Sequence, residues 1–152
     1  MNVVFIEKDD VARINSEELG VQVPENILKP NELDNVVMSI RRAMFGQYLY
    51  DDVFGMSANL AYYLAMSHIF IDANVRTAYM SALKMLELNG YDLDESFDIE
   101  YAKLLLDIVN HRKEVSDLIE FFRENCVTLD DDYYDDDEEE IANSMLRFQN
   151  II

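Results

Sequence analysis

The stretch NLAYYLAMSHIFIDANVRTAYMSALKMLELNGYDL, residues 59–93, decides the fold class. It continues an apolar segment that begins at residue 51, and the apolar residues fall on most sides of a helix, as in a buried central helix. The pattern breaks at Asp72-Ala73-Asn74 and restarts over residues 75–88, which Asn89-Gly90 is placed to end. The sequence therefore predicts two core helices, 51–70 and 75–88, joined by a short polar loop.

Apolar periodicity predicts further helices on both sides of this pair. Their ranges are 8–19, 31–46, 96–112 and 114–125. The second of these has Met44 on its apolar face and Gly46 at its end, where glycine commonly stops a helix. Residues 3–6 are expected to be extended, and residues 20–30, which include both prolines, to be a loop. Few strands are expected, so the predicted fold class is all-α.

Composition supports a helical domain with an acidic surface. The chain has 152 residues, half of them hydrophobic, with four glycines and two prolines, which favours one helical domain over a turn-rich β fold. The single cysteine, Cys126, has no internal disulfide partner, and the chain shows no signal peptide or bilayer-spanning run, so a cytoplasmic protein is expected. A net charge of −19 argues against direct binding to a nucleic-acid backbone.

The C-terminal region differs in composition from the rest. Residues 129–140 hold nine carboxylates, two tyrosines and no basic residue, so this run is expected to be extended and solvated. Residues 141–152 again show apolar residues at helical spacing. The predicted organisation is a folded domain over 1–128, an acidic linker over 129–140 and a C-terminal helix over 141–152. The acidic run is either a plain linker or a docking surface for a basic protein.

The polar loop between the core helices holds groups that suit phosphate chemistry. The first amides of a helix lack internal partners and carry partial positive charge, and Arg76 and Asn74 lie where they can contact an anion there. Asp72 can hold a divalent cation, and the imidazole of His68 can take a proton from a hydroxyl. These are the parts needed for transfer from a nucleotide. The alternative is a hydrogen-bonded histidine followed by an ordinary helix cap.

Residues 68–76, HIFIDANVR, resemble the signature of the Fic/Doc (Fido) family, His-x-Phe-x-Asp-Ala-Asn-Lys-Arg in its Doc (death-on-curing) branch. The surrounding residues are similar too, including ELNGY at 87–91, and a weaker similarity extends from Val4 to Asn125 without reaching the acidic tail. The resemblance implies a Fido-type helical domain, in which a central helix–loop–helix carries the HxFxDANxR motif.

This resemblance also implies a function. Doc proteins are toxins of toxin–antitoxin modules, often carried by phages and plasmids. By this resemblance we expect a kinase that uses ATP and magnesium to phosphorylate a protein hydroxyl, that of a threonine in elongation factor Tu. This modification would block translation in a bacterial host. By the same resemblance His68 would be the catalytic base, Asp72 would bind magnesium and position His68, and Arg76 would act in catalysis and hold nucleotide phosphates together with Asn74. A flap near residues 25–35 would dock the target, and an antitoxin segment would fold into a groove.

Two positions depart from the family pattern. Val75 stands where Doc proteins have lysine, and a charge-assisted contact of that kind is worth about 1.5–3 kcal/mol. Tyr79 stands where AMP-transferring relatives carry a further arginine, so AMP transfer is not favoured. An inhibitory motif Ser/Thr-x-x-x-Glu-Gly/Asn is not matched well, because Ser116 and Glu120 have the spacing but Phe121 breaks the last position.

A second interpretation follows from these departures and from the charge. The chain would then be a catalytically weak or inactive Fido-fold phage protein that acts by binding. Its acidic surface would mimic nucleic acid and inhibit a basic host protein or a CRISPR-defence protein. Both interpretations predict no membrane partner.

Overall fold

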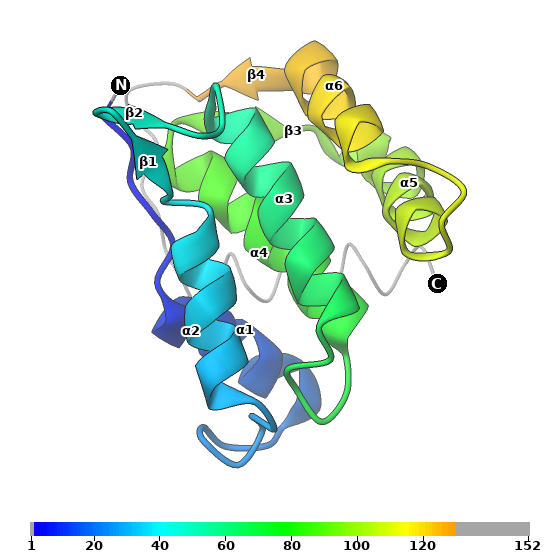
Figure 1. Cartoon of the computed structure of the whole chain (residues 1–152). Helices are drawn as coiled ribbons and strands as arrows, with labels where there is room; N and C mark the ends of the chain where they lie inside the picture. The colour runs from blue at the N-terminus through cyan, green and yellow to red at the C-terminus, as the bar shows by residue number, and fades with distance from the viewer. Residues whose placement is uncertain (1, 130–152) are drawn as a thin grey trace.

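The computed structural model describes residues 2–129, and the following statements concern that part of the chain. It contains a central pair of helices, four further α-helices and two small antiparallel sheets (Figure 1). The helices are α1 Lys8–Leu19, α2 Pro30–Ser39, α3 Val53–Met66, α4 Asn74–Leu88, α5 Asp98–Val109 and α6 Val115–Asn125, with a short 3-10 helix at Glu95–Phe97. The sheets pair β1 Ala43–Met44 with β2 Gln47–Tyr48, and β3 Tyr91–Leu93 with β4 Cys126–Thr128. The all-α prediction is confirmed.

Helices α3 and α4 form the centre of the fold, and their mutual packing is the most extensive between any two described elements. Both bury small side chains, which allow helices to approach closely. These are Ala58, Ala61 and Ala65 in α3 and Ala78, Ser81 and Ala82 in α4. In Figure 1, α1 and α2 lie on one side of this pair, and α5 and α6 lie on the other. The arrangement places the loop between α3 and α4 at one end of the molecule.

Aromatic side chains join α5 and α6 to the central pair. The rings of Tyr79 in α4 and Tyr101 in α5 stack with their centroids 4.1 Å apart, and Phe122 of α6 meets Tyr101 edge-on at 5.2 Å. The Tyr79 hydroxyl donates a hydrogen bond to Asp98 Oδ1 at 3.0 Å, and the Tyr101 hydroxyl donates to the Tyr79 carbonyl at 2.9 Å. Offset aromatic pairs of this kind add about 0.5–1.5 kcal/mol beyond their buried area.

The predicted helix over 31–46 is wrong in its second half. Helix α2 ends at Ser39, and β1 and β2 form a hairpin in which Ala43 pairs with Tyr48. Phe45 and Gly46 have φ angles of 52° and 79°, the left-handed pair that a two-residue hairpin turn of type I′ requires. Met44 is therefore exposed and not on a buried helix face. A glycine that follows apolar residues suits a hairpin turn as well as a helix end.

The long central helix is also shorter than predicted. Helix α3 ends at Met66, because His68 adopts a left-handed conformation with φ 49° that no continuing helix allows. Residues 69–71 instead run beside residues 26–29, and the Ile69 carbonyl accepts hydrogen bonds from the amides of Leu28 and Lys29 at 2.8 and 3.1 Å. Ile71, at the end of this segment, is 52% exposed. The ranges predicted for α1, α4, α5 and α6 agree with the structure to within a few residues.

The described residues share a single hydrophobic core. The remainder of the predicted acidic linker after Leu129 and the predicted helix over 141–152 lie outside the described residues. Among the helices of residues 2–129, none combines the length and the apolar character that crossing a bilayer requires.

Candidate functional site

A cleft of about 490 Å³ opens beside the loop that joins α3 to α4. Its lining contains all four residues predicted to form the site, namely His68, Asp72, Asn74 and Arg76. Its apolar lining residues come from the end of α3, the start of α4 and the last turns of α5. These residues are Ala65, Met66, Val75, Leu106 and Val109. The cleft therefore offers both polar and apolar contacts to a ligand.

Val75 contributes an apolar side chain to this cleft. Its side chain is partly buried and packs against the hydrophobic core, although the neighbouring Asn74 and Arg76 are polar. The lysine expected from the family pattern is thus replaced by a side chain that extends the apolar wall to the start of α4. No cation is present at this position to meet an anion.

The side chain of Asn74 stabilises the motif loop through two hydrogen bonds to the backbone of Phe70. Its Oδ1 accepts a hydrogen bond from the Phe70 amide at 3.0 Å, and its Nδ2 donates to the Phe70 carbonyl at 3.1 Å. An asparagine amide has two N–H groups, so one of them remains for a ligand. The fully buried ring of Phe70 anchors the same loop in the core. Asn74 therefore holds the loop in place, and its predicted contact with phosphate depends on the second N–H group of its amide.

The start of α4 provides unpaired backbone amides. The N-cap residue, Ala73, has a left-handed φ of 61° and no side chain that caps the helix, and the first turn of α4 contains no acidic residue. The first amides of a helix have no carbonyl partner within the helix, so this end carries partial positive charge. An anion placed in the cleft next to Asn74 and Val75 would meet that charge.

Asp72 is the carboxylate that lines the cleft. Its Oδ1 accepts a hydrogen bond from the Ala73 amide at 2.7 Å, and the residue is exposed. Within residues 2–129, no three His, Cys, Asp or Glu side chains come together as a metal cage. This donor set does not suit zinc, but it fits magnesium, which commonly binds one or two carboxylates and takes its other ligands from phosphates and water.

Arg76 forms an ion pair that the sequence did not reveal. Its Nη1 pairs with Oε1 of Glu18, which lies near the end of α1. The Glu18 side chain is 3% exposed and the Arg76 side chain is 34% exposed. No local pattern could have signalled this contact, because it joins helices that are far apart in the sequence.

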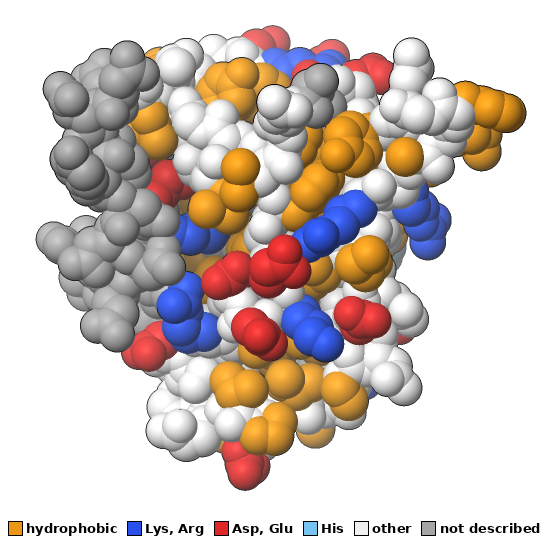
Figure 2. All heavy atoms as spheres, turned by 90° about the vertical axis from the view of Figure 1, so that its left-hand side faces the viewer, with side chains coloured by type: hydrophobic (Ala, Val, Ile, Leu, Met, Phe, Trp, Pro, Cys, Tyr) orange, Lys and Arg blue, Asp and Glu red, His pale blue; other side chains and the backbone are white. Residues whose placement is uncertain are grey.

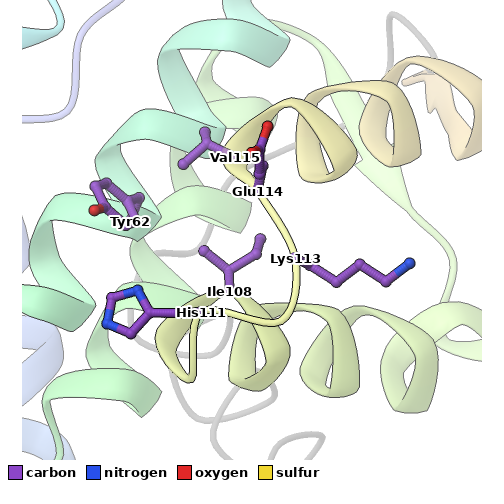
Figure 3. A pocket seen from close by; sticks show the side chains of 6 residues that line it. All are labelled: Tyr62, Ile108, His111, Lys113, Glu114 and Val115. Carbon is purple, nitrogen blue, oxygen red and sulfur yellow. The ribbon is translucent and has the colours of Figure 1, made fainter.

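A second hollow of about 360 Å³ lies where the end of α5 and the start of α6 approach α3. Its lining residues are Tyr62, Ile108, His111, Lys113, Glu114 and Val115. Figure 3 shows that the Lys113 side chain points away from the hollow, and that Tyr62 and His111 lie on one side of it. It shares no lining residue with the motif cleft, and it holds none of the predicted site residues.

Comparison with known proteins gives the class of this one. The Fic/DOC family model matches residues 5–86, which is more than half of the chain and includes the whole motif loop, so the chain belongs to the Fic/DOC family. The expected helical Fido fold is thereby confirmed. The chain is also similar to a curated protein, Toxin Doc of Mycolicibacterium smegmatis, with 28% identity over 108 residues that cover 71% of this chain and 82% of that protein.

Proposed function

We propose that this chain is a Doc-like toxin that transfers a phosphoryl group from ATP to a protein hydroxyl. The observation that carries the proposal is the convergence of His68, Asp72 and Arg76 on one cleft at the uncapped start of α4. The similarity to Toxin Doc of Mycolicibacterium smegmatis supports the toxin class.

Each group has a defined task in this proposal. His68 is exposed and lines the cleft. It accepts the proton of the target hydroxyl, whose oxygen then bonds to the γ-phosphorus as ADP leaves. The α4 amides and the free N–H groups of Arg76 hold phosphate oxygens. Asp72 would hold magnesium, which when bound offsets the charge of the phosphates. The apolar wall that includes Val75 receives the nucleoside.

The segment beside the motif supplies a docking edge for the target in this proposal. Residues 26–29 run alongside residues 69–71, with a bridge between Ile27 and Phe70. Leu28 is 62% exposed and Ile71 is 52% exposed, so two apolar side chains are available next to the cleft. We assign the threonine-containing segment of elongation factor Tu to this edge, and an antitoxin segment to a groove of the same domain.

A transfer assay with matched histidine variants tests the proposal. The purified protein is incubated with labelled ATP, magnesium and elongation factor Tu, and expression in bacteria is scored for growth arrest. We expect His68→Ala to abolish both labelling and arrest. His111→Ala is the control, because His111 is also exposed but lines the second hollow. Labelling by the wild type that does not exceed that of His68→Ala would contradict the proposal.

The net charge of −19 favours a second candidate, an acidic protein that binds a basic host or CRISPR-defence protein. On the face that carries the N-terminus, the hairpin and α2, acidic and basic side chains are interspersed and do not form one acidic surface (Figure 2). This face offers no continuous acidic surface, so we test the candidate on residues 130–140, which hold nine carboxylates. It predicts salt-sensitive binding, and a larger loss of function from reversing charges in 130–140 than from His68→Ala. The opposite ranking would exclude it.

A further inference from the structure

Three polar side chains lie buried directly behind the motif loop. They are Asn15 of α1, Asn26 of the segment before α2, and Thr77 of α4, and each is 0% exposed. None of them lines the motif cleft. Buried polar groups of this kind are stabilised by hydrogen bonds, so their partners show what they hold in place.

Their hydrogen bonds converge on the two carbonyls that flank Ala73. Asn15 Nδ2 donates to the Asp72 carbonyl at 2.9 Å and to Thr77 Oγ1 at 3.0 Å. The Thr77 hydroxyl donates to the Ala73 carbonyl at 2.7 Å. Asn26 Nδ2 orients Asn15 by donating to its Oδ1 at 3.1 Å. The backbone on both sides of Ala73 is thus held by side chains from outside the motif.

The backbone at this point sets the geometry of the cleft. Ala73 is left-handed, a conformation that alanine avoids, so the loop needs such support. The peptide between Asp72 and Ala73 carries both the carbonyl held by Asn15 and the amide that donates to Asp72 Oδ1. Its orientation therefore determines where the Asp72 carboxylate lies and how the first amides of α4 face the ligand.

We propose that Asn15 and Thr77 are positioning residues of the motif cleft. They touch no ligand, and they act by holding the peptide groups on either side of Ala73. The chemistry that they serve rests on the proposed function. The simpler role, in which this network contributes to folding stability alone, predicts no effect on ligand binding by the folded protein.

A matched pair of asparagine variants separates the two roles. Asn15→Ala removes the hydrogen-bond donor behind the motif. Asn89→Ala removes a comparable set of hydrogen bonds at the other end of α4. There, the Asn89 side chain bonds the amide and carbonyl of Val4 and the Met85 carbonyl. Both variants should lower Tm. We expect Asn15→Ala to raise the Kd for magnesium–ATP, measured by calorimetry on the full chain, by about tenfold, the order expected when hydrogen bonds that hold the loop are lost. Asn89→Ala should stay within about twofold of the wild type.

Thr77 provides a milder pair of variants in case Asn15→Ala folds poorly. Thr77→Val keeps the shape but removes the hydroxyl, so it should raise the Kd as Asn15→Ala does. Thr77→Ser keeps the hydroxyl and should restore binding close to that of the wild type. In the transfer assay, the two disruptive variants should lower kcat as well as raise KM, because Asp72 is displaced along with the amides.

Each outcome decides the proposal. If Asn15→Ala and Thr77→Val bind magnesium–ATP like the wild type, or if Asn89→Ala weakens binding equally, the network has a structural role alone and the proposal is wrong. If the wild type binds magnesium–ATP but transfers nothing, the kinase function fails while the Kd comparison still decides the role of Asn15. If the wild type binds no magnesium–ATP, both proposals fail.

Discussion

Glu18 near the end of α1 and Arg76 in the first turn of α4 form an ion pair, and Arg76 also lines the motif cleft. The glutamate is almost fully buried, while a third of the arginine side chain remains exposed. A guanidinium has five N–H donors, and the pair with Glu18 uses its Nη1, so donors remain for a ligand. The arginine of the motif is therefore both oriented and partly neutralised before any phosphate arrives.

Glu18→Gln is expected to strengthen anion binding and weaken the fold. Removing the carboxylate frees Arg76 from a competing negative charge, so the affinity for magnesium–ATP should rise by roughly three- to tenfold. The free energy of unfolding should fall by about 1–3 kcal/mol, less than for a fully buried pair because Arg76 is partly solvated. Calorimetry and urea unfolding measure the two effects. Glu17→Gln is the control, since it makes the same change at an exposed neighbour. A weaker affinity in Glu18→Gln would show that orientation by Glu18 outweighs its competing charge.

Val75→Lys is expected to increase nucleotide affinity by about tenfold, because it places an ammonium at the entrance of an anion site that lacks one. The variant should also lose about 0.5–1 kcal/mol of stability, since a cation at the start of a helix opposes the dipole and Val75 packs partly against the core. Titration with magnesium–ATP gives the affinity. Val75→Gln, which is polar but uncharged, separates charge from size. Equal affinities in the wild type and both variants would argue that the cleft does not bind phosphate.

Tyr79→Arg is expected to destabilise the protein by more than about 3 kcal/mol, because the side chain at this position is fully buried. The ring of Tyr79 stacks on Tyr101, and the residue does not line the cleft. Tyr79→Phe keeps the ring and loses the hydroxyl contact with Asp98, so it should cost about 1–2 kcal/mol. Urea unfolding of both variants provides the comparison. A stable Tyr79→Arg protein would mean that α5 can move away from α4.

Cys126 is expected to react slowly with thiol reagents near neutral pH. Burial first, and the charge of Asp92 second, raise the pKa of its thiol from the ordinary 9.0 to about 12, so little thiolate forms in the folded protein. The reaction rate should rise with pH toward 12, and it should rise at pH 8 when urea unfolds the chain. Because the unfolded thiol loses its proton first, this group makes the free energy of unfolding fall as pH rises from about 9 to about 12. Equal rates in folded and unfolded protein at pH 8 would contradict this pKa.

The central helices and the site between them were predictable from the sequence because their signals are local. Apolar residues at helical spacing on both sides of a short polar loop indicate two buried helices whatever surrounds them. The four polar residues lie within one loop and the first turn of a helix, so they share a cleft once that turn forms. Helix α4 follows the expected range closely for this reason.

The hairpin and the end of α3 were not predictable in the same way. Met44, Phe45 and Gly46 fit both a helix end and a hairpin, and the left-handed turn decides between them. The apolar pattern over 51–70 predicted a longer helix, but residues 69–71 form backbone hydrogen bonds with residues 26–29 instead. The backbone groups of residues 69–71 can form hydrogen bonds either within a helix or with residues 26–29. The apolar periodicity of one segment does not indicate which of the two is formed.

The sequence by itself therefore determined the family, the two core helices and the identity of the groups at the cleft, since these depend on neighbouring residues. The tertiary structure decided how those groups are held. Glu18 reaches Arg76 and Asn15 reaches the Asp72 carbonyl only because α1 packs against the start of α4. Such contacts join residues that are distant along the chain, and burial gives them their strength, because a polar group removed from water must find its partner within the fold.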